Sequence, residues 1–301
     1  MAKIGIVTVL YNSERVIEDF LRSLDKQSFK DFILYVVDNA SSDNGLNKAI
    51  ELSKEVSFQC IFFPESKNWG IAKGNNIGIK AAIKDDCEYV LLSNNDVVLN
   101  NIDTIELLLN RIEQDSIGII TPKILLYSEP SVIWAAGGKF KKPAVGIKHV
   151  GAYQQDCDKY NHEYIIDYSP TCFVLIKKTV FDLIGIMDET FFVYCDDTDF
   201  MYRARKKDIR ILYYPQTSIL HNESACTGKG SEFKIYQISK NQLIYVRKHF
   251  SDFVYYFLLL KNIFVHIIIH KFTFDEKQNR AEIRGFKDGI KYNRKRNSLL
   301  S

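Results

Sequence analysis

The sequence predicts an α/β fold with a mostly parallel sheet flanked by helices, followed by a C-terminal helical extension. Two observations predict it. Short apolar runs alternate with helical patterns through the first hundred residues, and polar side chains follow four successive apolar runs. Strand–helix alternation at this rhythm is typical of parallel strands joined by right-handed crossovers. In such open sheets, ligands bind beyond the carboxyl ends of the strands.

The elements of the first half follow one another in a regular order. Each short apolar run predicts a buried strand, and these runs span residues 4–10, 32–37, 60–63 and 89–93. Apolar residues at helical spacing predict helices over residues 15–24 and about 46–54, and a further helix that includes residues 77–83. The middle segment, about 117–215, is less regular, and we expect strands there at residues 117–120 and 172–176.

Length and composition describe an ordinary globular protein. With 301 residues, 46% of them hydrophobic and 26% charged, the chain can bury a sizeable core. The six cysteines are scattered and form no CxxC pair, which favours reduced thiols in a cytosolic protein over a disulfide framework or zinc site. The first apolar run is too short for a signal peptide. We therefore expect a cytoplasmic protein.

Charge divides the chain into two parts. Residues 226–301 hold 15 Lys and Arg against 6 Asp and Glu, a net charge of +9, whereas residues 1–225 have a net charge of −6. This asymmetry predicts an acidic domain over 1–225 and a basic, aromatic-rich helical extension over 226–301. Basic charge alone suits anionic phospholipid as well as nucleic acid.

The extension contains a strongly apolar segment. Residues 253–269 are 17 residues long, but Lys261, Asn262 and His266 interrupt them. A transmembrane helix needs roughly 20 apolar residues, so a span is marginal. An amphipathic segment lying on a membrane explains the sequence better, with the protein peripheral on the inner face of the plasma membrane. A helix that packs on the main domain explains it as well as membrane contact does.

Polar residues at the ends of four strands predict a binding site at one edge of the sheet. Turn chemistry accounts for each group alone, but four groups delivered to one edge favour a site. The groups are Tyr11-Asn12, Asp38 to Asp43, Asn68-Trp69-Gly70 and Asn94-Asn95-Asp96.

The run that ends in Asp96 has the chemistry of a metal ligand. A carboxylate after a strand suits Mg²⁺ or Mn²⁺, which prefer oxygen donors and usually keep phosphate and water ligands. A departing diphosphate needs such a cation because charge accumulates on it. An aspartate in this place alone is usually a turn residue or helix cap. His221 and the Gly/Ser/Thr/Lys loop after it suit a metal or phosphate contact, although a single histidine is more often structural.

A second acidic group, Asp196, Asp197 and Asp199, lies in an aromatic surround. Three carboxylates within four positions repel one another, and burial would raise the pKa of at least one. That tuning is expected of a general base that deprotonates a sugar hydroxyl. The alternative is a solvated helix N-terminus, where acids meet the helix dipole.

Taken in order, these motifs resemble family 2 glycosyltransferases with the GT-A fold, and most closely the bacterial rhamnosyltransferase-type enzymes of surface polysaccharide assembly. The resemblance covers about residues 3–230 and implies a Rossmann-like GT-A domain. It also implies an inverting hexosyltransferase that moves a sugar from dTDP-rhamnose or a UDP-hexose to a hydroxyl of a glycan or lipid-linked saccharide. The motifs are Thr8 to Asn12, Val37 to Asp43, Asn68 to Gly78, Asn94 to Asp96, Cys195 to Phe200, and His221.

The resemblance implies roles for individual residues. It makes Asp96 the metal ligand, with His221 as a further ligand or phosphate contact, and Asp197 the catalytic base. Asp196 stands where the family has Glu, so the base lies in one of these two residues. Asn94 and Asn95 leave a single carboxylate in the metal motif. The residues expected to bind the donor are Thr8, Tyr11, Asn12, Asp38, Ser41, Asp43, Asn68, Gly70, Lys73, Asn94, Asn95 and Asp96.

Two other functions are weighed against a transferase. Sugar-nucleotide pyrophosphorylases share the nucleotide-binding sheet but carry a Gly-rich basic loop after the first strand, where this chain has Tyr11-Asn12-Ser13. A degenerate transferase serving as a scaffold would not need its carboxylates, yet Asp96 and Asp197 stand at motif positions. We therefore expect an enzyme with no nucleic-acid partner and an acceptor pocket around residues 134–140 and 168–173. The oligomeric state stays open.

Overall fold

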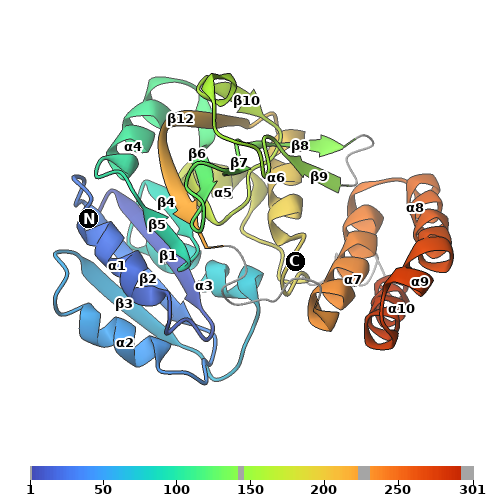
Figure 1. Cartoon of the computed structure of the whole chain (residues 1–301). Coiled ribbons are helices and arrows are strands. Elements are labelled where there is room, and N and C mark those ends of the chain that lie inside the picture. Colours follow the sequence, from blue (N-terminus) through green and yellow to red (C-terminus); the bar gives the residue numbers. More distant parts are fainter. Residues whose placement is uncertain (1, 142–145, 223–230, 293–301) are drawn as a thin grey trace. The chain divides into compact units, whose positions relative to one another are not determined.

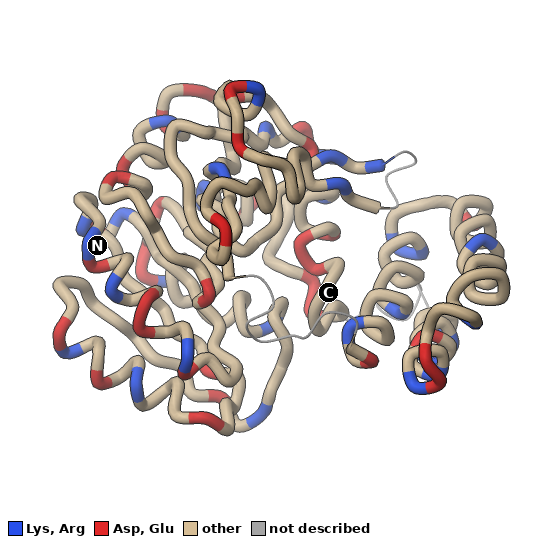
Figure 2. Tube along the Cα trace, in the orientation of Figure 1, with Lys and Arg blue, Asp and Glu red and all other residues tan. Residues whose placement is uncertain are grey.

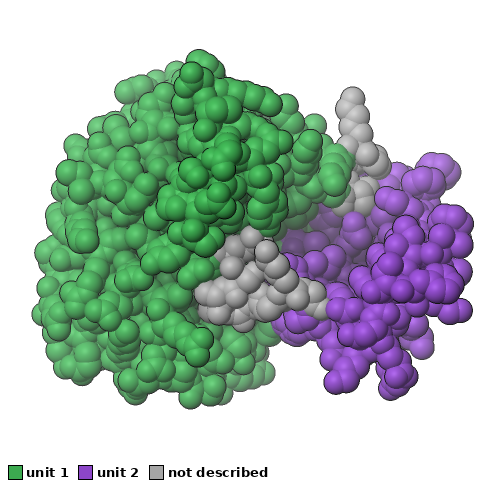
Figure 3. Space-filling model, viewed as in Figure 1, with its two compact units in different colours: residues 1–192, 196–226 green, residues 193–195, 227–301 purple. Residues whose placement is uncertain are grey.

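The computed structural model describes residues 2–141, 146–222 and 231–292. The chain divides into two compact units, residues 1–192 with 196–226, and residues 193–195 with 227–301 (Figure 3). The first unit is an α/β domain, and the described part of the second is helical apart from its turns (Figure 1).

One large sheet forms the centre of the first unit. Its strand order is β10-β12-β6-β11-β4-β1-β2-β3, while β5 pairs with β12 and β7 with β6. The strands of this sheet are β1 Ile4–Leu10, β2 Phe32–Asp38, β3 Gln59–Pro64, β4 Tyr89–Ser93, β5 Val97–Leu99, β6 Ile117–Leu126, β7 Ile133–Ala135, β10 Tyr164–Ile166, β11 Phe173–Lys177 and β12 Arg210–His221. A separate hairpin consists of β8 Gly138–Lys141 and β9 Gly146–His149.

Helices cover both faces of the sheet. Side chains alternate along β1, so Ile4 and Ile6 belong to the core that includes α1, α2 and α4, while Val7 belongs to the core that includes α3, α5 and α6. The helices are α1 Ile17–Asp25, α2 Gly45–Leu52, α3 Ile71–Lys84, α4 Thr104–Gln114, α5 Lys178–Ile184 and α6 Asp196–Lys206. A 3₁₀ turn spans Asp158–Tyr160.

The parallel strands put their carboxyl ends at one edge. β4, β1, β2 and β3 are parallel neighbours, which confirms the predicted mostly parallel sheet. β11 runs antiparallel to both β4 and β6, so the sheet is mixed on its other side. The bounds of β1 and β4 are those predicted, because both strands are continuous apolar runs.

Helix α3 is longer than predicted and lies very close to β1. It contains the predicted helical stretch 77–83 and begins six residues earlier, at Ile71. A Cβ atom added at Gly78 would overlap the Val7 side chain, so glycine is needed for this close approach. Asn75 and Asn76 are buried, and they break the apolar pattern from which the helix was predicted.

The described part of the second unit is a group of helices with one π-helical turn. A capping box, in which Asp275 and Gln278 satisfy each other's backbone N–H groups, starts α10. The helices are α7 Glu232–His249, α8 Asp252–Val265, α9 Lys271–Thr273 and α10 Glu276–Ile290, and the π-helical turn spans His266–His270.

The stretch from α8 to α9 exposes much of its apolar surface. Over Asp252–Thr273, 22 residues, it is long and apolar enough to cross a membrane, judged by length and composition alone. Tyr255 and Leu258 are its buried residues in α8. We call the residues that are more than half exposed the apolar face, which comprises Phe253, Tyr256, Phe257, Leu260, Phe264, Ile267, Ile268 and Phe272.

Candidate active site

Hydrogen bonds connect the loop after β1 to the loop after β2. Asn12, at a positive φ of 55°, accepts hydrogen bonds on Oδ1 from the backbone N–H of Ser42 at 2.8 Å and from its hydroxyl at 3.1 Å. Ser41 Oγ accepts the Asn12 backbone N–H at 3.0 Å and donates to Asp38 Oδ1 at 2.5 Å. The predicted donor residues Asn12, Asp38 and Ser41 therefore lie together at this edge.

Gly70 joins the loop after β3 to the same edge. Its carbonyl accepts from Asn39 Nδ2 at 3.0 Å, and its backbone N–H donates to Asn68 Oδ1 at 2.9 Å. At a φ of 82°, a Cβ atom there would overlap the carbonyl oxygen of Phe192, which accepts the Ile71 N–H at 2.7 Å. Glycine is therefore required, and it brings the segment before α6 to this edge.

Lys73, in the first turn of α3, is held by an aromatic ring. Its Nζ lies 3.4 Å from the centroid of Trp69, and Nζ of Lys67 lies 3.7 Å from the same centroid. The indole N–H of Trp69 donates to Glu65 at 2.9 Å, which fixes the ring. Cation–π contacts of this kind place two positive charges near the ends of the parallel strands.

Asp96 and His221 meet because β5 pairs with the end of β12. Val97 stands opposite His221 in that antiparallel pair. Asp96 Oδ1 lies 3.4 Å from His221 Nε2, and the His221 ring packs against Trp134 with centroids 4.5 Å apart. Among the residues that the structure describes, Asp96 Oδ1 and His221 Nδ1 are buried and have no hydrogen-bond partner. Buried polar atoms left unpaired are costly, so they mark a place where a ligand would be stabilised.

This pair fits a divalent cation with few protein ligands. Across residues 2–141, 146–222 and 231–292, no cluster of three or more His, Cys, Asp or Glu side chains is arranged to hold a metal. Mg²⁺ and Mn²⁺ sites often have one or two protein ligands plus phosphate and water, with neighbouring ligands about 3 Å apart in an octahedral shell. Asp96 and His221 satisfy that requirement. The predicted Gly/Ser/Thr/Lys loop after His221 falls largely on residues 223–230, outside the described residues.

The acidic group starts α6 and is mostly buried. Asp199 is fully buried and accepts from Arg203 Nε at 2.7 Å, so its charge is paired. Burial, and then the charge of Asp197, raise the pKa of Asp196 to about 8. The three aspartates do lie in the first turn of a helix, as the alternative prediction of a helix N-terminus has it, but Asp196 and Asp199 are buried and not solvated. A raised carboxyl pKa in this group agrees with the sequence-based expectation.

Asp197 is the partly exposed member of the group. Its Oδ2 accepts a hydrogen bond from the hydroxyl of Tyr168, and its Oδ1 accepts from the backbone N–H of Thr198 at 2.6 Å and the Thr198 hydroxyl at 3.1 Å. Tyr168 is buried, and burial followed by the charge of Asp197 raises its pKa well above the usual value, so it remains a donor. Asp197 is thus both oriented and reachable.

Asp96 and Asp197 are neighbours of one buried thiol. Burial, and then the charges of Asp96 and Asp197, raise the pKa of Cys172 well above its usual range. The carbonyl of Cys172 accepts the backbone N–H of Asn94 at 2.8 Å, which ties the start of β11 to the loop after β4. Two carboxylates about a hundred residues apart in sequence therefore lie in one region of the domain.

Several predicted donor residues direct their side chains into the protein. Thr8 is fully buried in β1. Asn95 donates to the carbonyl of Val9 at 2.6 Å. Asp43 accepts the backbone N–H groups of Glu14 and Gly45, at 2.8 Å and 3.0 Å. These side chains shape the loops of the edge, whereas Tyr11 is 45% exposed there.

Sequence reasoning missed a row of rings beside the two carboxylates. Trp134, which packs on His221, also lies 4.7 Å from the ring of His149, and His149 lies 5.8 Å from the ring of Tyr168. The row thus runs from the partner of Asp96 to the partner of Asp197. A single histidine on a short strand gave no signal for this contact.

Known proteins resemble this chain over most of its length. Residues 5–184 match the family model described as Glycosyl transferase family 2. The low-salt glycan biosynthesis hexosyltransferase Agl10 of Haloferax volcanii is 27% identical over 252 residues, 82% of this chain and 76% of that protein. The glycosyltransferase GlyG of Streptococcus pneumoniae is 22% identical over 236 residues, 77% of this chain and 74% of that protein.

Solved structures share the fold. S. aureus TarS 1–349 in complex with UDP-GlcNAc superposes with a TM-score of 0.62 at 17% identity, over 96% of this chain and 80% of that chain. The mannosyltransferase PcManGT from Pyrobaculum calidifontis, in complex with GDP-Man and Mn²⁺, gives a TM-score of 0.56 at 12% identity, over 96% and 87%. These likenesses confirm the predicted GT-A type of fold.

Proposed function

The chain belongs to glycosyltransferase family 2, and we propose that it is an inverting transferase acting from a nucleotide-diphosphate sugar on a saccharide hydroxyl. One observation carries the proposal. Asp96 follows β4 at the carboxyl end of the parallel strands, and the rings of Trp134, His149 and Tyr168 join its partner His221 to Asp197. Transfer needs positive charge beside the leaving diphosphate and a base beside the attacking hydroxyl, and the surroundings of these two carboxylates suit the two tasks.

Asp197 is the proposed base. Tyr168 and Thr198 hold its carboxylate by hydrogen bonds while leaving it partly exposed. It takes the proton of the acceptor hydroxyl as that oxygen attacks the anomeric carbon, and the bond from this carbon to the diphosphate breaks. A single displacement of this kind inverts the configuration. Asp196, buried and with a pKa of about 8, holds its proton at neutral pH and is the weaker alternative.

The loops after β1, β2 and β3 form the proposed donor site. Asn12, Asp38 and Ser41 are pre-organised by their mutual hydrogen bonds, and Lys73 adds positive charge for the phosphates. Mg²⁺ or Mn²⁺, held by Asp96 and His221, would neutralise the charge that develops on the diphosphate. Two solved structures with the same fold are complexes with UDP-GlcNAc or with GDP-Man and Mn²⁺. For this chain we propose dTDP-rhamnose or a UDP-hexose.

We propose a glycan or lipid-linked saccharide as the acceptor, in the assembly of surface polysaccharide. The second unit supports work at a membrane surface, since the apolar face is exposed and the segment 226–301 has a net charge of +9. An apolar helix face with surrounding basic residues binds anionic bilayers. The protein would then be peripheral on the inner face of the plasma membrane.

Vesicle sedimentation tests the membrane part. We expect the protein to sediment with phosphatidylglycerol vesicles more than with phosphatidylcholine vesicles. Leu260→Glu, on the apolar face, should reduce sedimentation, whereas Leu183→Glu, in α5 and similarly exposed at 62% against 67%, should not. Equal sedimentation of both variants and the wild type would contradict membrane contact through the apolar face.

A panel of nucleotide sugars tests the catalytic part. UDP-, dTDP- and GDP-sugars are compared by thermal shift with and without Mn²⁺, and nucleotide release is then followed with saccharide acceptors. A transferase releases nucleoside diphosphate in step with sugar transfer. Donor binding without transfer to any acceptor would favour the scaffold function, and synthesis of nucleotide sugar from a sugar phosphate would favour a pyrophosphorylase.

A further inference from the structure

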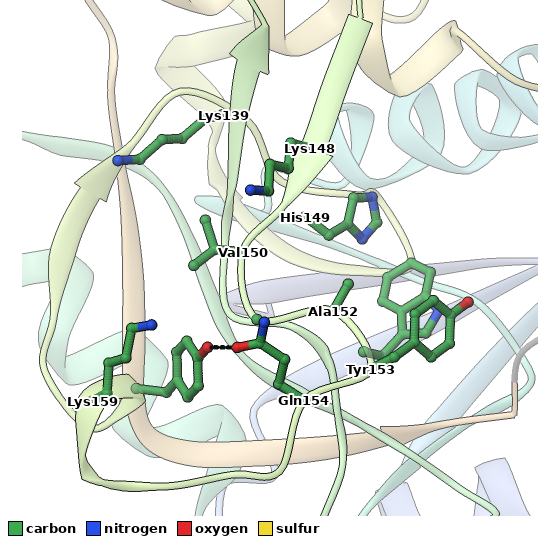
Figure 4. Close-up of a pocket in the computed structure, with 11 residues that line it drawn as sticks. Lys139, Lys148, His149, Val150, Ala152, Tyr153, Gln154 and Lys159 are labelled. Carbon is green, nitrogen blue, oxygen red and sulfur yellow. Dashed lines mark hydrogen bonds between the residues drawn. The ribbon is translucent and has the colours of Figure 1, made fainter.

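A pocket of about 650 Å³ opens in the first unit beside the β8–β9 hairpin (Figure 4). Its volume is in the range of small-molecule sites. The proposed donor and catalytic residues are not part of its lining. The lining residues that matter for its chemistry are Trp134, Lys139, Lys148, His149, Tyr153 and Lys159.

The pocket adjoins the proposed catalytic residues through its wall. Trp134 contacts the ring of His221, the partner of Asp96, and His149 contacts the ring of Tyr168, which donates to Asp197. A Cβ atom added at Gly138, the first residue of β8, would lie 2.6 Å from the Tyr168 ring, so the hairpin is packed directly on that tyrosine. The lining residues Trp134 and His149 therefore separate a molecule in this pocket from His221 and from Tyr168, the partners of the two proposed catalytic carboxylates.

The pocket has an excess of positive charge. Lys139 and Lys148 stand directly opposite each other in the β8–β9 pair, and Figure 2 shows lysines along both strands of the hairpin. Like charges in opposite positions destabilise a strand pair. Among the described residues, no carboxylate forms an ion pair with either lysine, and residues 138–149 contain no Asp or Glu. Lys159 adds a third ammonium group. An anionic ligand would relieve this repulsion.

The pocket also has aromatic faces suited to a sugar ring. Tyr153 is 61% exposed at a φ of 59°, a backbone conformation that is unfavourable for a bulky residue. Tyr160 is fixed by a hydrogen bond from its hydroxyl to Gln154 (Figure 4). Flat ring faces pack against the C–H faces of pyranoses, while lysines do not discriminate between sugars. Together they suit a saccharide that carries a negative charge.

We propose that this pocket binds a phosphate-bearing saccharide acceptor, with Lys139 and Lys148 contacting the phosphate. The inference rests on the proposed function, because it assigns the acceptor of that reaction. The phosphate belongs either to the glycan itself or to a lipid carrier, and the chemistry that the lysines recognise is the same. The acceptor hydroxyl then approaches Asp197 along the wall formed by His149 and Tyr168.

Binding of defined probes tests the proposal. The protein is first saturated with UDP and Mn²⁺, so that the donor site is not available to the probes. Glucose 1-phosphate, farnesyl diphosphate and neutral methyl glucoside are then titrated and followed by ligand-observed NMR. We expect at least one phosphate probe to bind about tenfold more tightly than methyl glucoside, with an advantage that falls as salt rises. Preference for glucose 1-phosphate indicates a phosphate on the glycan, and preference for farnesyl diphosphate indicates the carrier.

A matched pair of variants identifies the site. Lys139→Gln with Lys148→Gln should weaken phosphate-probe binding about tenfold, a loss typical of removing two partly screened charges. Lys80→Gln with Lys207→Gln removes the same charge from exposed positions outside the pocket and should leave binding unchanged. UDP binding, measured separately, should be the same in all three proteins.

The possible failures are distinguishable. If no phosphate probe binds more tightly than methyl glucoside, or if the pocket variant keeps wild-type affinity, the acceptor proposal is overturned. If the protein binds no nucleotide, the proposed function fails instead, and the probe titrations without UDP still report on the pocket.

Discussion

The buried hydroxyl of Tyr168 donates a hydrogen bond to Oδ2 of the partly exposed Asp197. The tyrosine precedes β11 and the aspartate lies in the first turn of α6, so the bond joins two elements that are distant in sequence. Because Thr198 holds the other carboxylate oxygen, the orientation of Asp197 is fixed from both sides. A base that needs no reorganisation when the acceptor arrives lowers the barrier to proton transfer.

Tyr168→Phe should therefore lower kcat for transfer about 10- to 100-fold, the usual worth of one hydrogen bond to a charged group. The KM for the donor should change little. Tyr213→Phe is the matched control, because Tyr213 is equally buried and its hydroxyl donates to the carbonyl of Tyr160 at 2.9 Å. A similar loss in both variants would mean that Tyr168 is only structural.

Asp196 makes stability depend on pH. Its pKa of about 8 in the folded state lies above the ordinary value of 3.8, so the folded state holds this proton more tightly than the unfolded state. The resulting stabilisation is complete below about pH 4 and is lost as pH rises through about 8. Asp196→Asn removes the titration. The wild type should therefore lose stability between pH 5 and pH 8, whereas the variant should not. The difference between the Tm of the variant and the Tm of the wild type should increase by about 3 °C or more over this range. A difference that does not change with pH would contradict a buried, protonated Asp196.

Gly70 should not tolerate a side chain. Gly70→Ala combines a positive φ with overlap on the Phe192 carbonyl. At Gly185, which has a similar φ of 73°, an added Cβ atom would meet no atom of the described residues within 4 Å apart from its chain neighbours. The control therefore measures the cost of the backbone conformation alone, roughly 1 to 3 kcal/mol, because both glycines have ψ near 180°. We expect Gly70→Ala to lower the free energy of unfolding by about 2 kcal/mol more, and to weaken UDP binding. If denaturant titrations give the same loss in the free energy of unfolding for both variants, the close contact with Phe192 does not require glycine at position 70.

Removal of the metal should weaken binding of the nucleotide donor and leave the protein folded. With only Asp96 and His221 as proposed ligands, the donor phosphates must complete the shell, so Mn²⁺ and UDP should bind cooperatively. We expect EDTA to reduce UDP affinity in calorimetry, and His221→Ala to reduce the Mn²⁺-dependent part about tenfold or more. His162→Ala, at an exposed position, is the control. UDP affinity that is indifferent to EDTA would contradict the proposed metal role.

The sequence predicted what depends on local patterns. β1 and β4 are continuous apolar runs, and both were located with correct bounds. The apolar pattern covers only residues 77–83 of α3, because Asn76, in its first half, is buried and pairs with Met187, which is far away in sequence. The acidic group is visible in the sequence, but which of its carboxyl groups is buried depends on tertiary packing. Only the ion pair of Asp199 could be predicted locally, because Arg203 follows it by four residues in the helix.

The proposed acceptor pocket shows the limit of such prediction more clearly. Trp134 and Lys139 line this pocket and lie in one of the two ranges predicted for the acceptor, whereas the other range, 168–173, contributes no lining residue. His149 and Lys148 were not predicted. Their role follows from the β8–β9 register and from ring contacts across separate loops. Neither feature leaves a periodic pattern in the sequence.

The most direct test of the central claim is sugar transfer by Asp197→Asn, measured together with donor binding. The asparagine keeps the shape of the side chain but cannot take the hydroxyl proton. The account predicts that transfer falls by at least about a hundredfold while affinity for UDP and Mn²⁺ stays within about twofold of wild type. Transfer at the wild-type rate would contradict the assignment of Asp197 as the base.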